Sequence, residues 1–387
     1  MKSKLTYDLL IIGGGISACV FASKYLQNNI NKNVALIEVG RGLGGRASTR
    51  ISKRFKGWEL NHGAPNLNIC NSKNNLLLES YINELLDKNF IKIDDSESVS
   101  LDKYSYKEAE NISEFSRGVN YISLFSMGRL SKKIIESNNL SGKIDFYFET
   151  LIIDLKFNNN KWYLKSKNGE EFTSKFLICS TNLLAHKRSL EILKTNHIPL
   201  RKAIPQNIDK KIDSLLNYLE KQLFVPRLTL LIYTNGNYSY KDFYTKKNRY
   251  FYLTKPQENK YKFERVIFQL IDKNKLGIVI HLKELDLINS YLKSKDEDLF
   301  KQKIFKSFNE IFKSNASIIP LTGNEKISVM KWRASQPSSC PVPLSLQLSE
   351  KCRIGFCGDW FEGDGFGRIE GSILSALILA NKFKNLN

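Results

Sequence analysis

The feature that most constrains the fold is the run of three glycines in LLIIGGGISACV, at positions 9–20. The apolar residues 7–12 precede the glycines, and residues 16–27 follow them with helical periodicity. A second short apolar run, VALIE, occupies positions 34–38. A buried strand, a glycine turn, a helix and another buried strand form a βαβ unit, which requires a parallel sheet. We therefore expect an α/β fold.

The glycine turn carries a recognisable spacing. Gly13, Gly15 and Ala18 occupy the three positions of G-x-G-x-x-G/A. The first glycine permits a tight turn, the second lets backbone approach a pyrophosphate at the helix N-terminus, and the third position must only be small. Glu38 ends the second strand, where its carboxylate can accept a hydrogen bond from a ribose hydroxyl. The pattern predicts a dinucleotide site and disfavours a 2′-phosphate, but it leaves NAD and FAD open.

A second glycine loop, RGLGGRAST at 41–49, follows the acidic strand end directly. Gly44 and Gly45 let backbone approach the same cofactor from another side, and Arg46 can bind phosphate through two parallel hydrogen bonds. This segment resembles the GRxGGR segment of the flavin amine oxidases and related FAD-dependent oxidoreductases. The resemblance implies FAD as the cofactor, and no cysteine lies where a covalent flavin link would be expected.

The C-terminal stretch FCGDWFEGDGFGRIEGS supports the same resemblance. Gly358 and Asp359 fit the GD motif with which these proteins hold the ribityl and phosphate part of FAD. The residues IEGS at 369–372 begin a helix whose positive end can stabilise the negative charge of reduced flavin. The resemblance implies a glutathione-reductase-like FAD-binding Rossmann domain with a second, mixed α/β substrate domain.

The residues expected to hold the cofactor lie in these motifs and in the segments beside them. They are Gly13, Gly15, Ile16, Ser17, Ala18, Glu38, Val39, Gly44, Gly45, Arg46, Asn61, His62, Gly63, Ala64, Ile152, Gly358, Asp359, Ile369, Glu370, Gly371 and Ser372. The dispersed cysteines and histidines predict no metal site.

The segment KWRASQP at 331–337 resembles the KWRY-type segment that lies beside the flavin in renalases and renalase-like bacterial proteins. The chain departs from the family pattern at Asn61, where an acidic residue is usual, at Ala334, where an aromatic residue is usual, and in the insertion 361–367. We expect His62, Trp332 and Arg333 at the substrate pocket, with Arg333 as an anchor for an anionic substrate. Two interpretations of His62 stay open. It could contact the substrate or carry a proton, or it could be a loop histidine that only makes a structural hydrogen bond.

Two domains are expected from the length of 387 residues. We assign 1–65, 115–185 and 335–387 to a discontinuous FAD-binding domain, and 66–114 and 186–334 to the substrate domain. Residues 70–111 have helical tendency. Runs at 144–150, 151–157 and 161–166 predict a β-meander that leads to a buried strand at 175–181. Helices are expected at 209–222 and 296–313, and strands at 228–234 and 277–282.

The resemblance implies hydride transfer from a small reduced substrate, such as a dihydronicotinamide isomer, to flavin. Reoxidation by O₂ would yield hydrogen peroxide. Two alternatives stay open on the same fold: an amine oxidase or desaturase, and a binding protein without catalysis.

The composition bears on partners and location. Lys and Arg exceed Asp and Glu by 59 to 39, a net charge of +20, but the lysines are scattered rather than gathered in a stripe. We therefore expect a solvated basic surface rather than a nucleic-acid interface. No secretory leader and no apolar run of spanning length is recognised, and the six cysteines suit a reducing compartment. We expect a cytoplasmic monomer or homodimer.

Overall fold

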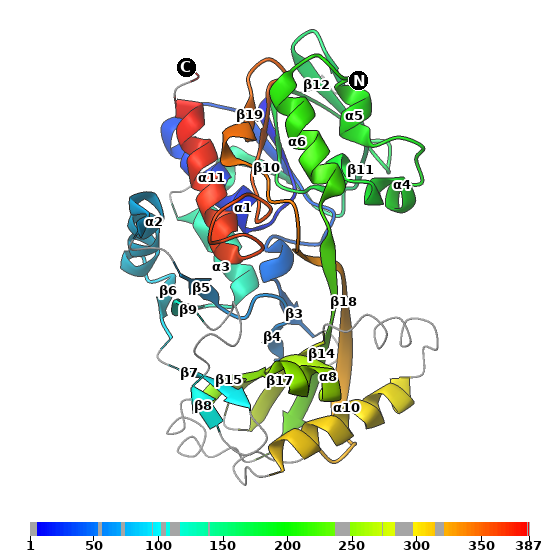
Figure 1. Ribbon diagram of the computed structural model, residues 1–387. Coiled ribbons are helices and arrows are strands. Elements are labelled where there is room, and N and C mark those ends of the chain that lie inside the picture. The colour runs from blue at the N-terminus through cyan, green and yellow to red at the C-terminus, as the bar shows by residue number, and fades with distance from the viewer. Residues whose placement is uncertain are drawn as a thin grey trace.

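The computed structural model describes residues 6–52, 56–70, 74–94, 96–101, 106–108, 117–137, 140–236, 248–272, 274–282, 297–313, 321–384 and 386. An eight-stranded sheet organises the upper body in Figure 1, and a seven-stranded sheet organises the lower body. Two long strands, β14 (Phe224–Asn235) and β18 (Lys326–Pro337), run from one body into the other. The chain is therefore a mixed α/β protein with two sheets.

The upper sheet is built on parallel strands, as the βαβ pattern predicted. In spatial order they are β10 (Ile144–Tyr147), β2 (Val34–Ile37), β1 (Thr6–Ile12), β13 (Glu171–Cys179) and β20 (Ile354–Phe356). Strands β11 (Ile152–Asn158) and β12 (Lys161–Ser166) join β13 as an antiparallel meander, and β19 (Leu348–Ser349) pairs with β20. The run 144–150, expected in the meander, instead pairs with β2, because a strand's partner depends on tertiary contacts.

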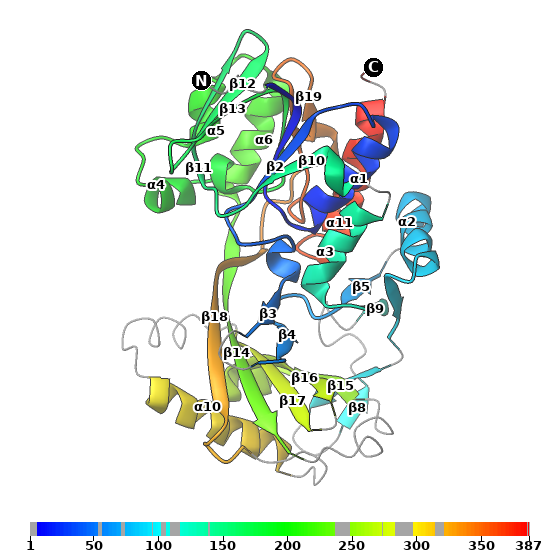
Figure 2. The same cartoon turned by 180° about the vertical axis from the view of Figure 1, so that it is seen from behind.

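Alternating side chains of β1 pack against two different hydrophobic cores. Leu9 and Ile11 face the core that contains α1 (Ile16–Asn28), α3 (Met127–Glu136) and α11 (Ile369–Lys384). Leu10 and Ile12 face the opposite core, which contains α6 (Lys210–Lys221). Both faces of this sheet are covered, which explains why its parallel strands are apolar throughout. Figure 2 shows the same layers from behind.

The lower sheet has one covered face and one face turned toward the upper body. Its strand order is β18, β14, β17 (Lys275–Leu282), β16 (Phe263–Asp272), β15 (Asn248–Leu253), β7 (Glu97–Leu101) and β8 (Tyr106–Glu108). Phenylalanines of α10 (Glu297–Phe312) pack on the covered face. On the other face, Leu60 of β4 (Glu59–Asn61) packs over Gly277, where an added Cβ would lie 2.1 Å from Cδ2 of the leucine.

The other described elements connect these sheets. They are β3 (Thr49–Ile51), which pairs with β4; β5 (Leu67–Ile69), β9 (Val119–Ser123) and β6 (Ile91–Ile93), which form a small sheet; and the helices α2 (Leu76–Asp87), α4 (Arg188–Leu193), α5 (Pro199–Ala203) and α8 (Lys255–Tyr261). Within the described ranges, no helix combines the length and the apolarity that crossing a bilayer requires.

The packing differs from the sequence expectation in two places. In the described part of 70–111, α2 is followed by strands β6, β7 and β8, because β6 pairs with β9, β7 pairs with β15 and β8 pairs with β7. Helices α5 and α6, placed in the substrate domain by the division at residue 186, share the core of the upper sheet. Residues Leu67–Ile69 and α2 likewise pack in the first core of the upper body. Amphipathic periodicity shows that a helix buries one face, but not which sheet covers it.

The start of α11 generates a stability prediction. Gly371 packs against the loop at Gly365, where an added Cβ would lie 2.2 Å from the carbonyl oxygen. Gly→Ala inside a helix ordinarily stabilises by up to about 1 kcal/mol. Here we expect Gly371→Ala to destabilise by about 1–3 kcal/mol, because the backbone must shift. Urea unfolding measures this change. Gly142→Ala, at an exposed site with open space around it, should change stability by less than about 0.5 kcal/mol; equal effects would contradict the steric argument.

Candidate functional site

A cavity of about 530 Å³, which we call the central pocket, lies between the two sheets. One side, the glycine-loop wall, is lined by Gly13, Gly14, Gly15, Ile16, Ser17, Glu38, Gly44, Gly45, Arg46, Ala47, Ser180, Thr181, Asp359, Ile369 and Ser372. The other side, the sheet wall, is lined by Phe224, Arg227, Thr229, Arg265, His281, Trp332 and Ala334. Residues of 62–68, 182–192, 335–336, 360 and 367–368 complete the lining. Segments from both ends of the chain thus share one site.

The first glycine loop presents the N-terminus of α1 to the pocket. Gly13 has φ +99°, a conformation that suits glycine, and its N–H donates to Ile37 O at 2.8 Å. The N-cap residue of α1 is Gly15, so no side chain accepts a hydrogen bond from the first N–H groups of the helix. The first turn of α1 contains no acidic residue. The orphan N–H groups and the positive end of the helix therefore face a position that suits an anion.

Glu38 joins the first glycine loop to the loop that follows β2. Its Oε2 accepts from Gly14 N and its Oε1 accepts from Gly40 N, both at 2.6 Å. These two backbone N–H groups fix the orientation of the carboxylate without a ligand. Each carboxylate oxygen can still accept one more hydrogen bond. This placement is compatible with the hydrogen bond to a ribose hydroxyl that the sequence predicts.

The second glycine loop packs directly on the first. Gly44 N donates to Gly14 O at 2.8 Å, and a Cβ at Gly45 would lie 3.0 Å from Gly15 Cα. Only residues without a side chain allow this approach. Gly63 also packs against this loop. A Cβ at position 63 would lie 1.9 Å from Arg46 O, so a larger residue would not fit there.

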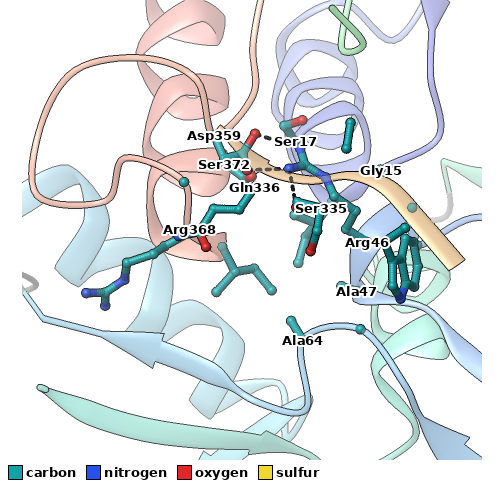
Figure 3. Close-up of a pocket in the computed structure, with 18 of the residues that line it drawn as sticks. Gly15, Ser17, Arg46, Ala47, Ala64, Ser335, Gln336, Asp359, Arg368 and Ser372 are labelled. Atoms are coloured by element: carbon teal, nitrogen blue, oxygen red, sulfur yellow. Dashed lines mark hydrogen bonds and ion pairs between the residues drawn. The ribbon is translucent and has the colours of Figure 1, made fainter. Parts of the chain in front are cut away.

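Arg46 and Asp359 form the main ion pair of the pocket (Figure 3). Arg46 Nη1 and Nη2 each donate to an Asp359 carboxylate oxygen at 2.6 Å, and Nη1 also donates to Ser335 O at 3.0 Å. The sequence predicted a phosphate contact for Arg46 and a ribityl contact for Asp359. The structure shows each residue positioning the other, and the guanidinium retains further N–H groups for an anion.

The beginning of α11 is tied to the segment 66–70 rather than to the pocket interior. Arg368 and Glu370 form a buried ion pair at 3.1 Å. Glu370 also accepts from Cys70 N at 3.1 Å, and Arg368 Nη2 donates to Asn68 Oδ1 at 2.7 Å. Arg368 lines the pocket and Glu370 does not. Glu370 therefore fixes the helix start, whereas Ile369 and Ser372 line the cavity.

His62 and Trp332 meet where the glycine-loop wall reaches the sheet wall. Their ring centroids lie 5.2 Å apart, and Trp332 Nε1 donates to Thr229 Oγ1 at 3.2 Å. Burial, and then the charge of Arg50, lower the pKa of His62 to about 4. The imidazole is therefore neutral at pH 7. Nε2 lies 3.3 Å from Ser48 Oγ, so the expected loop hydrogen bond is present in a residue that also lines the pocket.

Several buried polar atoms in the lining have no hydrogen-bond partner among the described residues. They include His62 Nδ1, Asn66 Nδ2, Asn182 Nδ2 and Trp360 Nε1. Asn66, Asn182 and Trp360 each have an N–H donor at the unpartnered atom. Buried donors are costly unless paired, so these residues fit a bound group rich in acceptor atoms, as a flavin dinucleotide is.

Eight of the expected site residues lie outside the lining. Ala18 is buried beneath the loop, which agrees with its packing role at the third fingerprint position. Val39 is 61% exposed. Asn61 holds Thr49 Oγ1 at 2.7 Å and Met127 N at 3.1 Å, and so fixes local backbone. The others are Ile152, Arg333, Gly358, Glu370 and Gly371.

Two of these placements correct the sequence analysis. Ile152 is buried in the core between the upper sheet and its helices, because β11 belongs to the meander. Arg333 is exposed, because successive side chains of β18 point to opposite faces and Trp332 takes the pocket side. Gly358 lies outside the lining but makes room for a residue that lines the pocket. A Cβ at position 358 would lie 2.3 Å from the indole of Trp360, so the glycine allows Trp360 to reach the lining.

Sequence reasoning identified Trp332 and Ala334 but missed the other residues of the sheet wall. Arg227, Arg265 and His281 all line the pocket, and their side chains are almost completely buried. The sequence contains one usable signal: Arg227 and Arg265 interrupt apolar strand runs, FVPRLTLLIYT and FERVIFQL. Charged residues are almost never fully buried unless they are paired, so an arginine inside an apolar strand run indicates a specific polar environment.

Comparisons with known proteins agree with this architecture. Residues 11–85 match the model of an NAD(P)-binding Rossmann-like domain. No curated protein matches the sequence. The fold is similar to that of a protein from Exiguobacterium sp. 255-15 assigned as a protoporphyrinogen oxidase, with a TM-score of 0.67, 11% identity and 100% of both chains covered.

Putrescine oxidase is also similar. An engineered variant gives a TM-score of 0.64 at 10% identity over 99% of this chain and 100% of that chain. The wild type bound to putrescine gives 0.61 at 10% identity, over 98% and 99%. At these identities the likeness shows a shared fold, and substrate and reaction must be argued from the pocket.

The lowered pKa of His62 predicts a pH-dependent stability. The unfolded residue titrates near its ordinary value of about 6.5 and the folded residue at about 4. Below 6.5 the unfolded chain binds a proton that the folded chain does not, so stability present at pH 7 is lost as the pH falls. We expect this residue to remove about 2 kcal/mol of unfolding free energy between pH 7 and pH 5.

Urea unfolding of the wild type and His62→Gln at both pH values, with the same cofactor content, measures this contribution. The loss in the variant should be smaller by about 2 kcal/mol. Equal losses in the two proteins would mean that His62 is not held neutral.

Proposed function

We propose that this chain is a renalase-like oxidoreductase that binds FAD non-covalently in a glutathione-reductase-like domain and oxidises a small reduced substrate. The observation that carries the proposal is the continuity of the central pocket from the glycine loops to the His62–Trp332 contact. Bound FAD would supply a hydride acceptor that O₂ reoxidises, with hydrogen peroxide as product. A dihydronicotinamide isomer is the substrate type that the KWR and GDW motifs favour.

The residues of the glycine-loop wall would bind the dinucleotide. The N-terminus of α1 and Gly13–Gly15 would take the pyrophosphate, with Arg46 beside it. Glu38 would accept from the ribose, and Asp359, which the ion pair holds in place, would accept from a ribityl hydroxyl. Asn66, Asn182 and Trp360 offer the buried donors described above.

The sheet wall would position the substrate and exclude water. Hydride transfer depends on alignment more than on a general acid or base. Trp332 presents a flat apolar surface that is fixed by its bond to Thr229, and His62 packs against it. Because His62 is neutral, it would act as a hydrogen-bonding contact rather than as a charged proton donor.

The cysteines support non-covalent binding. None of the described residues that line the pocket is a cysteine. Burial raises the pKa of Cys19, Cys179 and Cys357, so these thiols are poor nucleophiles.

The proposal predicts that the purified protein is yellow or takes up added FAD. Arg46→Gln should weaken FAD binding about tenfold or more, because it removes a charged hydrogen-bond donor and leaves Asp359 without its partner. Arg41→Gln is the matched control: Arg41 lies in the same loop but is exposed and outside the lining. Fluorescence titration with FAD measures both. A colourless protein that does not bind FAD would favour a binding protein on this fold.

A second experiment tests the reaction. The flavin-loaded protein is mixed anaerobically with dihydronicotinamide isomers and with amines, and the visible absorption of the flavin is followed. We expect a dihydronicotinamide isomer to bleach the flavin and air to restore its colour with formation of hydrogen peroxide. If only amines bleach the flavin, the amine oxidase alternative is correct. Putrescine oxidase, whose fold is similar to that of this chain, is named for an amine substrate.

A further inference from the structure

The first residue of α4, Arg188, brings to the central pocket a cation that the proposed function does not use. Arg188 lines the pocket together with Asn182 and Phe224. Helix α4 lies beside the upper end of β14 (Figure 1), and the guanidinium carbon of Arg188 is 4.4 Å from the centre of the Phe224 ring. This contact holds the guanidinium in place without neutralising its charge. Arg188 therefore lies next to the sheet wall as a fixed, half-buried cation.

The hydrogen-bond partners of the Arg188 side chain carry no charge. Nε donates to His186 Nδ1 at 3.2 Å, and Nη2 donates to Asn182 Oδ1 at 3.0 Å. His186 Nε2 donates to Gln222 O at 2.7 Å, so Nδ1 is the acceptor of the ring, and burial lowers the pKa of this histidine. The ring is therefore neutral at pH 7. Among the described residues, no carboxylate pairs with Arg188, and Nη1 keeps its N–H groups for a ligand.

Asn182 adds a second donor beside this cation. Its Oδ1 accepts from Arg188, which determines the orientation of the amide, because an NH₂ group in that position would set two donors against each other. The remaining polar atom, Nδ2, has no hydrogen-bond partner among the described residues, and the residue is only 7% exposed. A buried N–H group is costly unless it is paired. Because Asn182 lines the pocket, a bound ligand can supply the acceptor.

Both donors lie close to the glycine loops. Ser180, two residues before Asn182, places its Oγ 2.9 Å from Ser17 Oγ in the first turn of α1. Burial, and then the positive charge of Arg46, lower the pKa of Arg188 to about 10, so Arg188 is still charged at pH 7. The two guanidinium groups repel each other, and an anion near both would reduce that repulsion.

We infer that Arg188 and Asn182 form a phosphate site in the central pocket. The guanidinium edge and the amide present N–H groups from two side chains, and a phosphate has enough oxygens to accept from both. The inference rests on the proposed function for the identity of the ligand. The phosphate belongs either to the diphosphate of FAD or to a substrate that carries a phosphate.

Two pairs of ligands that differ only in phosphate distinguish these sources. ADP and adenosine are titrated calorimetrically into the full chain, with its flavin removed if it is purified yellow. Nicotinamide mononucleotide and nicotinamide riboside are titrated into the protein supplied with FAD. In at least one pair, the phosphate-bearing ligand should bind about tenfold or more tightly than its partner. A preference for ADP that depends on Arg188 assigns the site to the cofactor, and such a preference for the mononucleotide assigns it to the substrate.

Variants test whether this preference comes from the two residues. Arg188→Gln should weaken binding of the phosphate-bearing ligand about tenfold and leave its phosphate-free partner unchanged. Asn182→Asp should give a similar loss, because the carboxylate keeps the contact with Arg188 but replaces the free donor with an anion. Arg188→Lys should give a smaller loss, and it serves as the test if the Gln variant does not fold.

Lys187→Gln is the matched control. Lys187 precedes Arg188 in the chain, but it is exposed and lies outside the lining. The control should leave all four affinities unchanged. A loss as large as that of Arg188→Gln would mean that general surface charge attracts the phosphate, and it would refute the site.

Two further results would overturn the inference: equal losses for both members of a pair, which would mean that Arg188 acts only through packing, or phosphate binding that no variant of the two residues alters. Failure of the proposed function gives a different result. A protein that does not bind FAD, but loses affinity for ADP in Arg188→Gln, refutes the flavin proposal alone. A flavoprotein whose Arg188 variants bind all four ligands as the wild type does refutes this inference alone.

Discussion

The ion pair between Arg46 and Asp359 joins residues 313 positions apart in the chain and forms part of the pocket wall. The same arginine donates to Ser335 O on β18 and accepts at its own carbonyl from Ala64 N. One residue thus connects the second glycine loop, the strand that enters the lower sheet and the loop after β20. Because Asp359 is almost completely buried, removing Arg46 would leave a buried carboxylate without its charged partner. The geometry of the glycine-loop wall therefore depends on the placement of the lower sheet.

The two walls of the central pocket have different electrostatic characters. In the glycine-loop wall, helix N–H groups, Glu38 and the Arg46–Asp359 pair are arranged for a dinucleotide with both donors and acceptors. In the sheet wall, the buried side chains of Arg227 and Arg265 are each held by a neighbour, Arg227 by Glu264 and Arg265 by His281. Charges are expensive to bury in any protein, so the pairing of these arginines beside a cavity is more informative than the apolar lining around them.

Much of the glycine-loop wall could be predicted, because each of its motifs depends on local spacing. Gly13, Gly15 and Arg46 lie at fixed distances from strand ends, and Asp359 follows a recognisable strand. The failures have a common cause in long-range packing. Arg333 and Trp332 are neighbours in sequence, yet β18 directs them to opposite faces, and periodicity alone does not say which face meets the pocket. Ile152 was misplaced because the partners of the meander determine what its residues contact.

The βαβ unit, the two glycine loops and the acidic end of β2 could be read from the sequence, since they follow from local backbone chemistry and residue size. Which charged side chains share the pocket depends instead on tertiary packing. Arg227, Arg265 and His281 come from three strands whose register is set by pairing across the lower sheet. Register between strands far apart in the chain is a property of the whole packed core, and no local pattern encodes it.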